Sequence, residues 1–374
     1  MIARPLLALL PFVAGALGLP APPPRPPAAL AARSDTTFDT VFVVSNRRRT
    51  ASEFLREPTD SLWHGLYVVR VIAQPNDVPE LARLDVERVD SAALDVLDWR
   101  ARLRTAAARD TTAEGAVLLY VHGYSSNPGY ATNQGVQVKH RGDHAGPLVL
   151  FLWPAHDMSR TIRSPLSAYR EDERAAAQSV AAFARALQEV HAVAPDAVLL
   201  AHSMGNRLAL GAAVSDAETR AQLEAHPLRA IGLFSPDVGA DRFRDEYAMA
   251  LPLVAQRIAM YGASTDYLLG ASALVNRERR AAGITRRGAP LPGIELVDDT
   301  RGARAEPALL NFIGAKHAVR WASAALVDFF DVVAAGVPPR CRVTAGAADS
   351  VGVGRWRLKA GGQRITALVA DCHP

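Results

Sequence analysis

Short apolar runs alternate with longer amphipathic segments along most of this chain. The runs are rich in β-branched residues and are bounded by polar or turn residues, which is typical of strands. They lie at 40–45, 66–72, 116–121, 148–153, 197–202, 228–234, 257–261 and 293–297. Helical spacing of apolar residues marks segments at 91–108, 130–139, 166–190, 242–254, 267–280 and 319–333, with Ser91 as the expected cap of the first. The alternation predicts an α/β fold, a mostly parallel sheet with helices on both faces.

Ser203 lies where one of these buried strands is expected to turn into a helix. The residues two before and two after it are Ala201 and Gly205. Small residues at these positions let a strand and a helix pass closely at a sharp turn, and the pattern departs from Gly-x-Ser-x-Gly only at Ala201. The new helix would point its N–H groups at an oxyanion beside the serine, with Met204 as one donor. We interpret Ser203 as a nucleophile; the alternative is an ordinary serine cap on a strand-to-helix turn.

A second buried run ends in the turn His122-Gly123-Tyr124. In acyl-transfer enzymes the loop after such a strand supplies the second oxyanion donor, and Gly123 lets the backbone approach a substrate. We expect the backbone N–H of Tyr124 to be that donor. His122 is interpreted as a residue that orients the loop rather than as a catalytic base.

A serine hydroxyl needs an adjacent base, usually a histidine that a carboxylate orients. On sheets of this kind the chain order is serine, acid, histidine. Three histidines follow Ser203. We choose His317 as the base because it lies in a loop before the last predicted helix, whereas His226 precedes a strand and His373 lies in the C-terminal tail.

Two aspartates compete for the role of the acid. Asp266 follows the strand two positions beyond the one that leads to Ser203, which is the usual place for this residue. Asp237 follows the intervening strand. We expect Asp266 to orient His317 and keep Asp237 as the alternative acid.

Composition limits the other function classes. The chain has 374 residues, of which 49% are hydrophobic, enough for one large α/β domain. Its net charge of +4 comes almost wholly from arginines, which cluster only at 47–49 and 277–287. Because neither an aromatic-interleaved basic patch nor zinc-ligand spacing accompanies them, we expect no nucleic-acid binding. The chemistry at Ser203 needs no metal and no other cofactor.

Both ends of the chain differ from its middle. Residues 1–32 combine an arginine, a short apolar run and a Pro/Ala-rich stretch, which predicts a secretory signal and leader and therefore a periplasmic or extracellular protein with no transmembrane helix in the mature chain. The hydrolase-like domain is expected over 33–336. A β-hairpin-like extension at 337–374, formed by 354–358 and 364–369, would be closed by a disulfide between Cys341 and Cys372. The sequence sets no oligomeric state.

Several motifs together carry a family resemblance. They are Val41-Phe42-Val43-Val44-Ser45-Asn46-Arg47, Tyr120-Val121-His122-Gly123-Tyr124, Phe151-Leu152-Trp153-Pro154, Ala201-His202-Ser203-Met204-Gly205-Asn206-Arg207 and Ser235-Pro236-Asp237-Val238 with Phe243. Between Thr40 and Phe330 the chain resembles an uncharacterised bacterial α/β-hydrolase family, catalogued as a domain of unknown function. The resemblance implies the α/β-hydrolase fold, Ser203 as nucleophile and an acid in a Tyr-x-x-x-x-Asp segment, here Tyr261 to Asp266. The family's histidine lies in a Gly-His-Ser-Tyr-like loop, where this chain reads Ala315-Lys316-His317-Ala318.

These interpretations predict a serine hydrolase that cleaves a small-molecule or lipid-like ester through an acyl-enzyme. Acyl transfer to another acceptor and peptide hydrolysis would use the same residues. The alternative from a different class is an envelope-associated binding or scaffold protein that keeps the fold without turnover.

Overall fold

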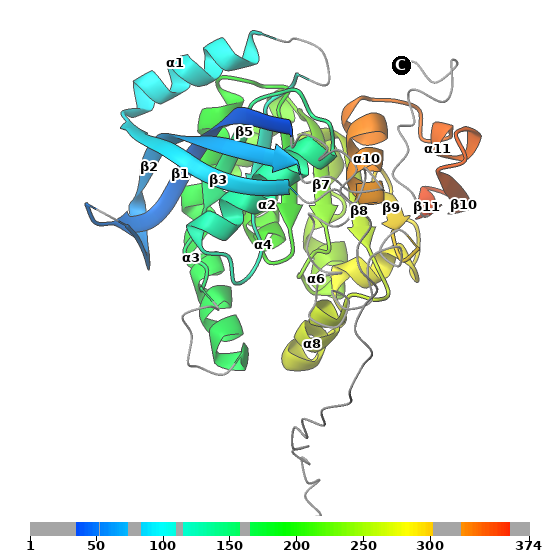
Figure 1. The fold of residues 1–374 in the computed structure, drawn as a ribbon. Coiled ribbons are helices and arrows are strands. Elements are labelled where there is room, and N and C mark those ends of the chain that lie inside the picture. Colours follow the sequence, from blue (N-terminus) through cyan, green and yellow to red (C-terminus); the bar gives the residue numbers. More distant parts are fainter. Residues whose placement is uncertain are drawn as a thin grey trace, which may run out of the picture. The chain divides into compact units, whose positions relative to one another are not determined.

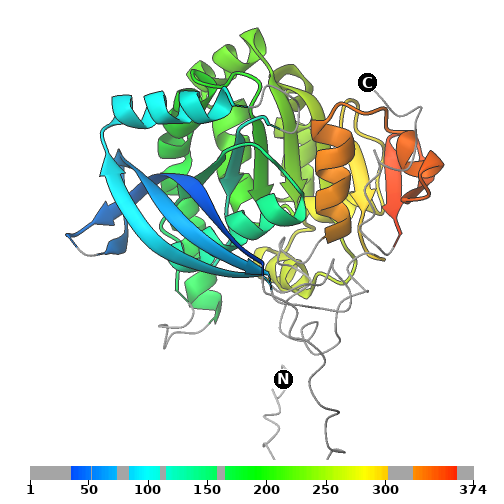
Figure 2. The same cartoon turned by 45° about the horizontal axis from the view of Figure 1, so that its top comes forward.

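The computed structural model describes residues 35–51, 53–73, 84–109, 115–157, 165–301 and 323–359. These residues form an 11-stranded sheet with helices on both of its faces (Figures 1 and 2). The strands are β1 (Asp35–Arg49), β2 (Phe54–Ala73), β3 (Leu84–Leu94), β4 (Leu118–Val121), β5 (Leu148–Leu152), β6 (Val198–His202), β7 (Leu228–Phe234), β8 (Ala255–Gly262), β9 (Glu295–Asp298), β10 (Ala348–Gly352) and β11 (Arg355–Leu358). Their order across the sheet is β10-β11-β9-β8-β7-β6-β4-β5-β1-β2-β3.

The centre of the sheet is parallel, as predicted. Strands β5, β4, β6, β7, β8 and β9 pair in parallel with their neighbours, and β1 continues the parallel series beside β5. Their residues are mostly buried, because both faces of the sheet are covered. The structure has the α/β-hydrolase arrangement of a mostly parallel sheet between helical layers.

The helices divide between the two faces. They are α1 (Val96–Ala107), α2 (Pro128–Arg141), α3 (Pro165–His191), α4 (Gly205–Leu210), α5 (Ala217–Ala225), α6 (Ala240–Arg242), α7 (Leu251–Val254), α8 (Tyr267–Asn276), α10 (Ser323–Asp328) and α11 (Cys341–Thr344). Wider or tighter helical turns cover Gly211–Ser215, Phe243–Tyr247, Ala281–Thr285 and Phe329–Ala334. Side chains alternate along each strand, so Leu119 and Val121 join the core with α1 and α3, whereas Leu118 and Tyr120 join the core with α2 and α10.

The first three strands form a long antiparallel meander at one edge of the sheet (blue, left in Figure 1). We did not predict β3 from the sequence. The predicted cap Ser91 is wrong, because it lies within β3; Asp95 caps α1 instead, and its carboxylate accepts the N–H groups of Leu97 and Asp98. The first helix therefore begins later than its apolar spacing suggested.

The C-terminal segment adds to the opposite edge. The strand expected at 354–358 is present as β11, which pairs antiparallel with β10 and also in parallel with β9. The described part of the predicted extension thus continues the main sheet. Its second predicted strand at 364–369, Cys372 and the leader at 1–32 lie outside the described residues, so the predicted domain boundaries and disulfide stay predictions. No helix within the described ranges is long and apolar enough to cross a membrane.

Candidate active site

Ser203 lies at the sharp turn between β6 and α4. Its backbone has a φ of 52°, in the left-handed region that non-glycine residues rarely adopt. Two neighbours hold it there, since its N–H donates to the Phe234 carbonyl at 2.9 Å and its carbonyl accepts the Asp237 N–H at 3.2 Å. Such strain in a residue held by its surroundings is characteristic of functional sites. The local geometry is therefore that of a nucleophile elbow.

Glycines let the neighbouring strand approach this turn. A Cβ at Gly205 would lie 2.5 Å from the His122 carbonyl oxygen, and one at Gly123 would lie 2.9 Å from the Ser203 Cβ. Asn206 stabilises the turn, because its side-chain amide donates to the carbonyls of Ser203 and Phe234 at 2.9 and 3.2 Å. The small residues are needed because the loop after β4 crosses directly over the elbow.

That loop is the predicted oxyanion loop. Tyr124 lines the same cavity as Ser203, and Met204 follows the serine in the chain and is fully buried. Ser125, which follows Tyr124, has a φ of 56°, and its N–H donates to the buried carboxylate of Asp172 at 2.9 Å. Asp172 also accepts the backbone N–H of His156 at 2.8 Å. A carboxylate on α3 therefore fixes the loop that presents Tyr124.

His122 supports the loop, in agreement with its predicted role. It is fully buried and stacks on Trp153, with ring centres 5.2 Å apart. The Trp153 indole N–H donates to the His122 carbonyl at 2.8 Å. Burial lowers the pKa of His122 to about 3, so its ring is neutral near pH 7. A buried, neutral imidazole that stacks on tryptophan is a positioning group.

An apolar cavity of about 180 Å³ opens beside Ser203. The N-terminal part of α3 and the helix α8 form its walls, and both project at the same end of the sheet (Figure 1). Its apolar lining residues are Leu166, Leu268, Leu269, Ala271 and Val275. The volume is small for a whole ligand, so it fits the apolar part of a substrate whose reacting bond lies at the serine.

Asp237 lies in the same cavity but already has several partners. Its carboxylate accepts hydrogen bonds from the hydroxyls of Tyr169, at 2.8 Å, and Ser272, and the Arg280 guanidinium lies 3.2 Å away. Burial, followed by the charge of Asp237, raises the pKa of Tyr169 to about 12, so this hydroxyl stays protonated. Asp237 thereby joins α3, α8 and the turn after β7.

Asp266 follows β8, as predicted, and caps α8. Its carboxylate accepts the Leu269 N–H at 3.0 Å, and the residue is 7% exposed. It lines a neighbouring cavity of about 310 Å³ that shares Leu269 with the apolar cavity. The predicted base His317 lies outside the described residues. The structure thus brings Ser203, Tyr124 and Asp237 into one cavity. Asp266 lines the neighbouring cavity, and Leu269 lines both.

Sequence reasoning missed the role of Asp172. The sequence held a signal, because Ala168 and Ala176, four residues before and after Asp172, place it on an apolar stripe of the helix, and the structure buries both alanines fully. An acidic residue on the buried stripe of an amphipathic helix indicates a specific partner. Within the described residues, no group of three or more His, Cys, Asp or Glu side chains gathers as metal ligands do.

Comparison with known protein families places part of the chain in a family. The model of a family described as alpha/beta hydrolase of unknown function (DUF900) matches residues 100–298. Searches of curated proteins and of solved structures found no match. The matched segment includes Ser203, the Gly123 turn and both candidate acids, and it leaves out strands β1 to β3 and His317.

Proposed function

Because this chain belongs to the DUF900 family of alpha/beta hydrolases, we propose that it is a serine hydrolase that cleaves carboxylic esters with an apolar acyl group. The observation that carries the proposal is the strained backbone of Ser203 at the edge of an apolar cavity. A strained serine at a strand-to-helix turn exposes its hydroxyl to a substrate, and the small apolar cavity accepts an acyl chain.

In the proposed reaction the Ser203 hydroxyl attacks the ester carbonyl. His317 takes the serine proton and returns it to the leaving alcohol, and Asp266 orients the imidazole. The backbone N–H groups of Tyr124 and Met204 hold the oxyanion of the tetrahedral intermediate. The acyl group is then bound to Ser203, and a water activated by His317 releases it as the acid.

We assign the acid to Asp266 rather than Asp237 because of their partners. Asp237 accepts bonds from Tyr169 and Ser272 and lies against Arg280. Turning it toward an imidazole would break contacts that join two helices. We therefore expect Asp266→Asn to lower kcat about 10²- to 10⁴-fold, whereas Asp237→Asn destabilises the fold.

The deciding experiment is labelling with a fluorophosphonate probe together with cleavage of p-nitrophenyl esters of increasing chain length. Ser203→Ala should lose both labelling and turnover, and Ser61→Ala, an exposed serine in β2, should keep both. Labelling that persists in Ser203→Ala would contradict the nucleophile assignment. Absence of labelling and turnover in the folded wild-type chain would favour the non-catalytic scaffold, and alcohol acceptors added to the assay would reveal acyl transfer.

We also propose that the protein is exported. The proposal rests on the sequence of residues 1–32 and on the two cysteines near the C-terminus. Expression with this segment should give a periplasmic or secreted product shortened at its N-terminus. An unprocessed product that stays inside the cell would contradict export.

A further inference from the structure

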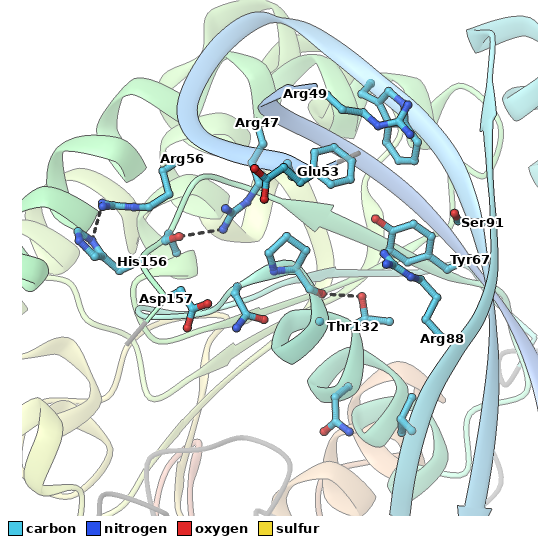
Figure 3. Close-up of a pocket in the computed structure, with 18 of the residues that line it drawn as sticks. Arg47, Arg49, Glu53, Arg56, Tyr67, Arg88, Ser91, Thr132, His156 and Asp157 are labelled. Atoms are coloured by element: carbon cyan, nitrogen blue, oxygen red, sulfur yellow. Dashed lines mark hydrogen bonds between the residues drawn. The ribbon is translucent and has the colours of Figure 1, made fainter. Parts of the chain in front are cut away.

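A larger cavity, separate from the two described above, lies between the three N-terminal strands and the start of α2 (Figure 3). Its volume is about 630 Å³, and none of its lining residues lines the cavity at Ser203. Four arginines reach it from three strands, namely Arg47, Arg49, Arg56 and Arg88. Two carboxylates, those of Glu53 and Asp157, also line it, so positive charge predominates.

Aromatic rings hold two of the arginines in place. The Arg49 guanidinium lies 5.1 Å from the centre of the Trp63 ring, and that of Arg88 lies 4.8 Å from the centre of the Tyr67 ring. Neither arginine forms an ion pair with any carboxylate in the described part of the chain. Stacking orients a planar guanidinium while leaving its N–H groups for another partner.

Arg47 adds a buried positive charge. Its Nε and Nη2 donate to the carbonyls of Trp153, Ser126 and Ala155 at 2.9–3.0 Å. Its Nη1 makes no hydrogen bond within the described residues, although the residue is only 3% exposed and lines the cavity. Burial lowers the pKa of Arg47 to about 10, so the side chain keeps its charge near pH 7.

The N-terminal end of a helix faces the same space. The start of α2 also lines the cavity through Asn127, Pro128 and Gly129, and its first turn contains no acidic side chain. The N-terminal end of a 14-residue helix carries partial positive charge. Guanidinium groups and the positive end of α2 thus lie around one cavity.

We propose that this cavity binds a phosphate-bearing small molecule. Guanidinium groups bind phosphate oxygens in a bidentate geometry, and a phosphate offers acceptors in several directions to donors that come from several strands. The cavity has the size of a complete small-molecule site and exceeds what one inorganic ion fills. The phosphate lies between Arg49, Arg88 and Arg47, and the organic part lies against the half-buried rings of Phe54 and Trp63.

The cavity is next to the predicted oxyanion loop. Arg47 donates to the Ser126 carbonyl, and Arg56 Nη2 lies 2.6 Å from the Nδ1 of His156. His156 in turn donates its backbone N–H to Asp172, which accepts the N–H of Ser125. Residues 124–127 therefore separate the two cavities, with Tyr124 on one and Asn127 on the other. The proposed site goes beyond the proposed hydrolase activity, since its binding is measured without turnover.

The test is calorimetric titration of the full chain with inorganic pyrophosphate, at constant ionic strength. The variants are Arg49→Gln, Arg88→Gln and their double, and the matched control is Arg102→Gln, an exposed arginine on α1. Each single change should weaken binding about 10-fold and the double change about 100-fold. Glu53→Gln should tighten binding, and Arg102→Gln and Ser203→Ala should leave it unchanged.

A second arm separates a soluble phosphate compound from a lipid headgroup. Sedimentation with phosphatidylcholine vesicles, with and without phosphatidic acid, is measured for the same variants. Arginine-dependent binding of pyrophosphate supports a soluble ligand, and arginine-dependent binding of phosphatidic acid vesicles alone supports a lipid headgroup. If wild type and the double variant behave alike in both arms, or if citrate binds as tightly as pyrophosphate, the proposal is wrong.

Discussion

The carboxylate of Asp172 on α3 accepts the backbone N–H of Ser125 at 2.9 Å, so one buried side chain fixes the loop after β4. This loop carries Tyr124, whose N–H is the proposed oxyanion donor. The pairing joins residues that are 47 positions apart in the chain.

Asp172→Asn should impair turnover more than substrate binding. The amide keeps the size of the side chain but weakens the charged acceptor for Ser125, so the oxyanion donor loses its fixed place. We expect kcat to fall about 10- to 100-fold while KM changes less than about threefold, since loss of an oxyanion donor itself costs about 10²–10³. Steady-state kinetics on a p-nitrophenyl ester measures the split. The exposed Asp98→Asn is the control. A rise in KM of about 10- to 100-fold with kcat unchanged would instead assign Asp172 to substrate binding.

Ala271→Trp should shorten the preferred acyl chain. Ala271 lines the apolar cavity, and an indole there fills space that an acyl chain would occupy. We expect kcat/KM for octanoyl esters to fall about 10-fold or more, with acetyl esters changed less than about threefold, because each buried methylene is worth about 0.8 kcal/mol. Leu274→Trp is the control on the same helix, since Leu274 is 82% exposed and does not line the cavity. A uniform loss across all chain lengths would exclude this cavity as the acyl site.

Gly205→Ala and Gly270→Ala should have opposite effects on stability. A Cβ at Gly205 would lie 2.5 Å from a backbone oxygen, whereas one at Gly270 in α8 meets no atom within 4 Å. We expect Gly205→Ala to lower the free energy of unfolding by about 2 kcal/mol or more and to abolish activity. Gly270→Ala should raise it by about 0.5–1 kcal/mol, because alanine favours the helix. Urea unfolding of both variants measures these changes. If Gly205→Ala left the free energy of unfolding unchanged, the turn at Ser203 would have room to shift.

Asp39 should contribute stability that is lost in acid. Burial opposes its ionisation, but hydrogen bonds and charges of His140 and Lys139 outweigh burial and lower its pKa from 3.8 to about 2. The unfolded chain therefore binds a proton more readily, and the contribution is complete above pH 4 and lost as pH falls toward 2. We expect Asp39→Asn to cost about 1–2 kcal/mol at pH 7 and less at pH 3. The same cost at both pH values would contradict the ion-pair explanation.

The predicted disulfide between Cys341 and Cys372 has a direct test. Peptide mapping without reduction should give a linked peptide, and Cys372→Ala should lower the free energy of unfolding by about 2–4 kcal/mol under oxidising conditions. Cys341 is 1% exposed, so its replacement would also leave a small cavity. The test therefore uses Cys372→Ala, with reduced wild type as the control. Equal stability of oxidised and reduced wild type would argue against the bond.

The sequence by itself determined the alternation of strands and helices and the place of Ser203. Buried parallel strands are continuous apolar runs, and a sharp strand-to-helix turn needs small residues on both sides of its serine, so both features are local patterns. The strand at 354–358 and the structural role of His122 followed from the same kind of reasoning. The family match supports the resulting fold class.

Only the tertiary structure decided which distant side chains meet. Asp172 reaches Ser125, Asp237 joins two helices, and Arg49 and Arg88 line one cavity although they come from different strands, β1 and β3. The strand β3 was missed, and with it the place of Arg88, because its residues are mostly exposed and show no strong apolar alternation. Contacts across a sheet depend on strand order and register, and the hydrophobic pattern of one segment does not contain either.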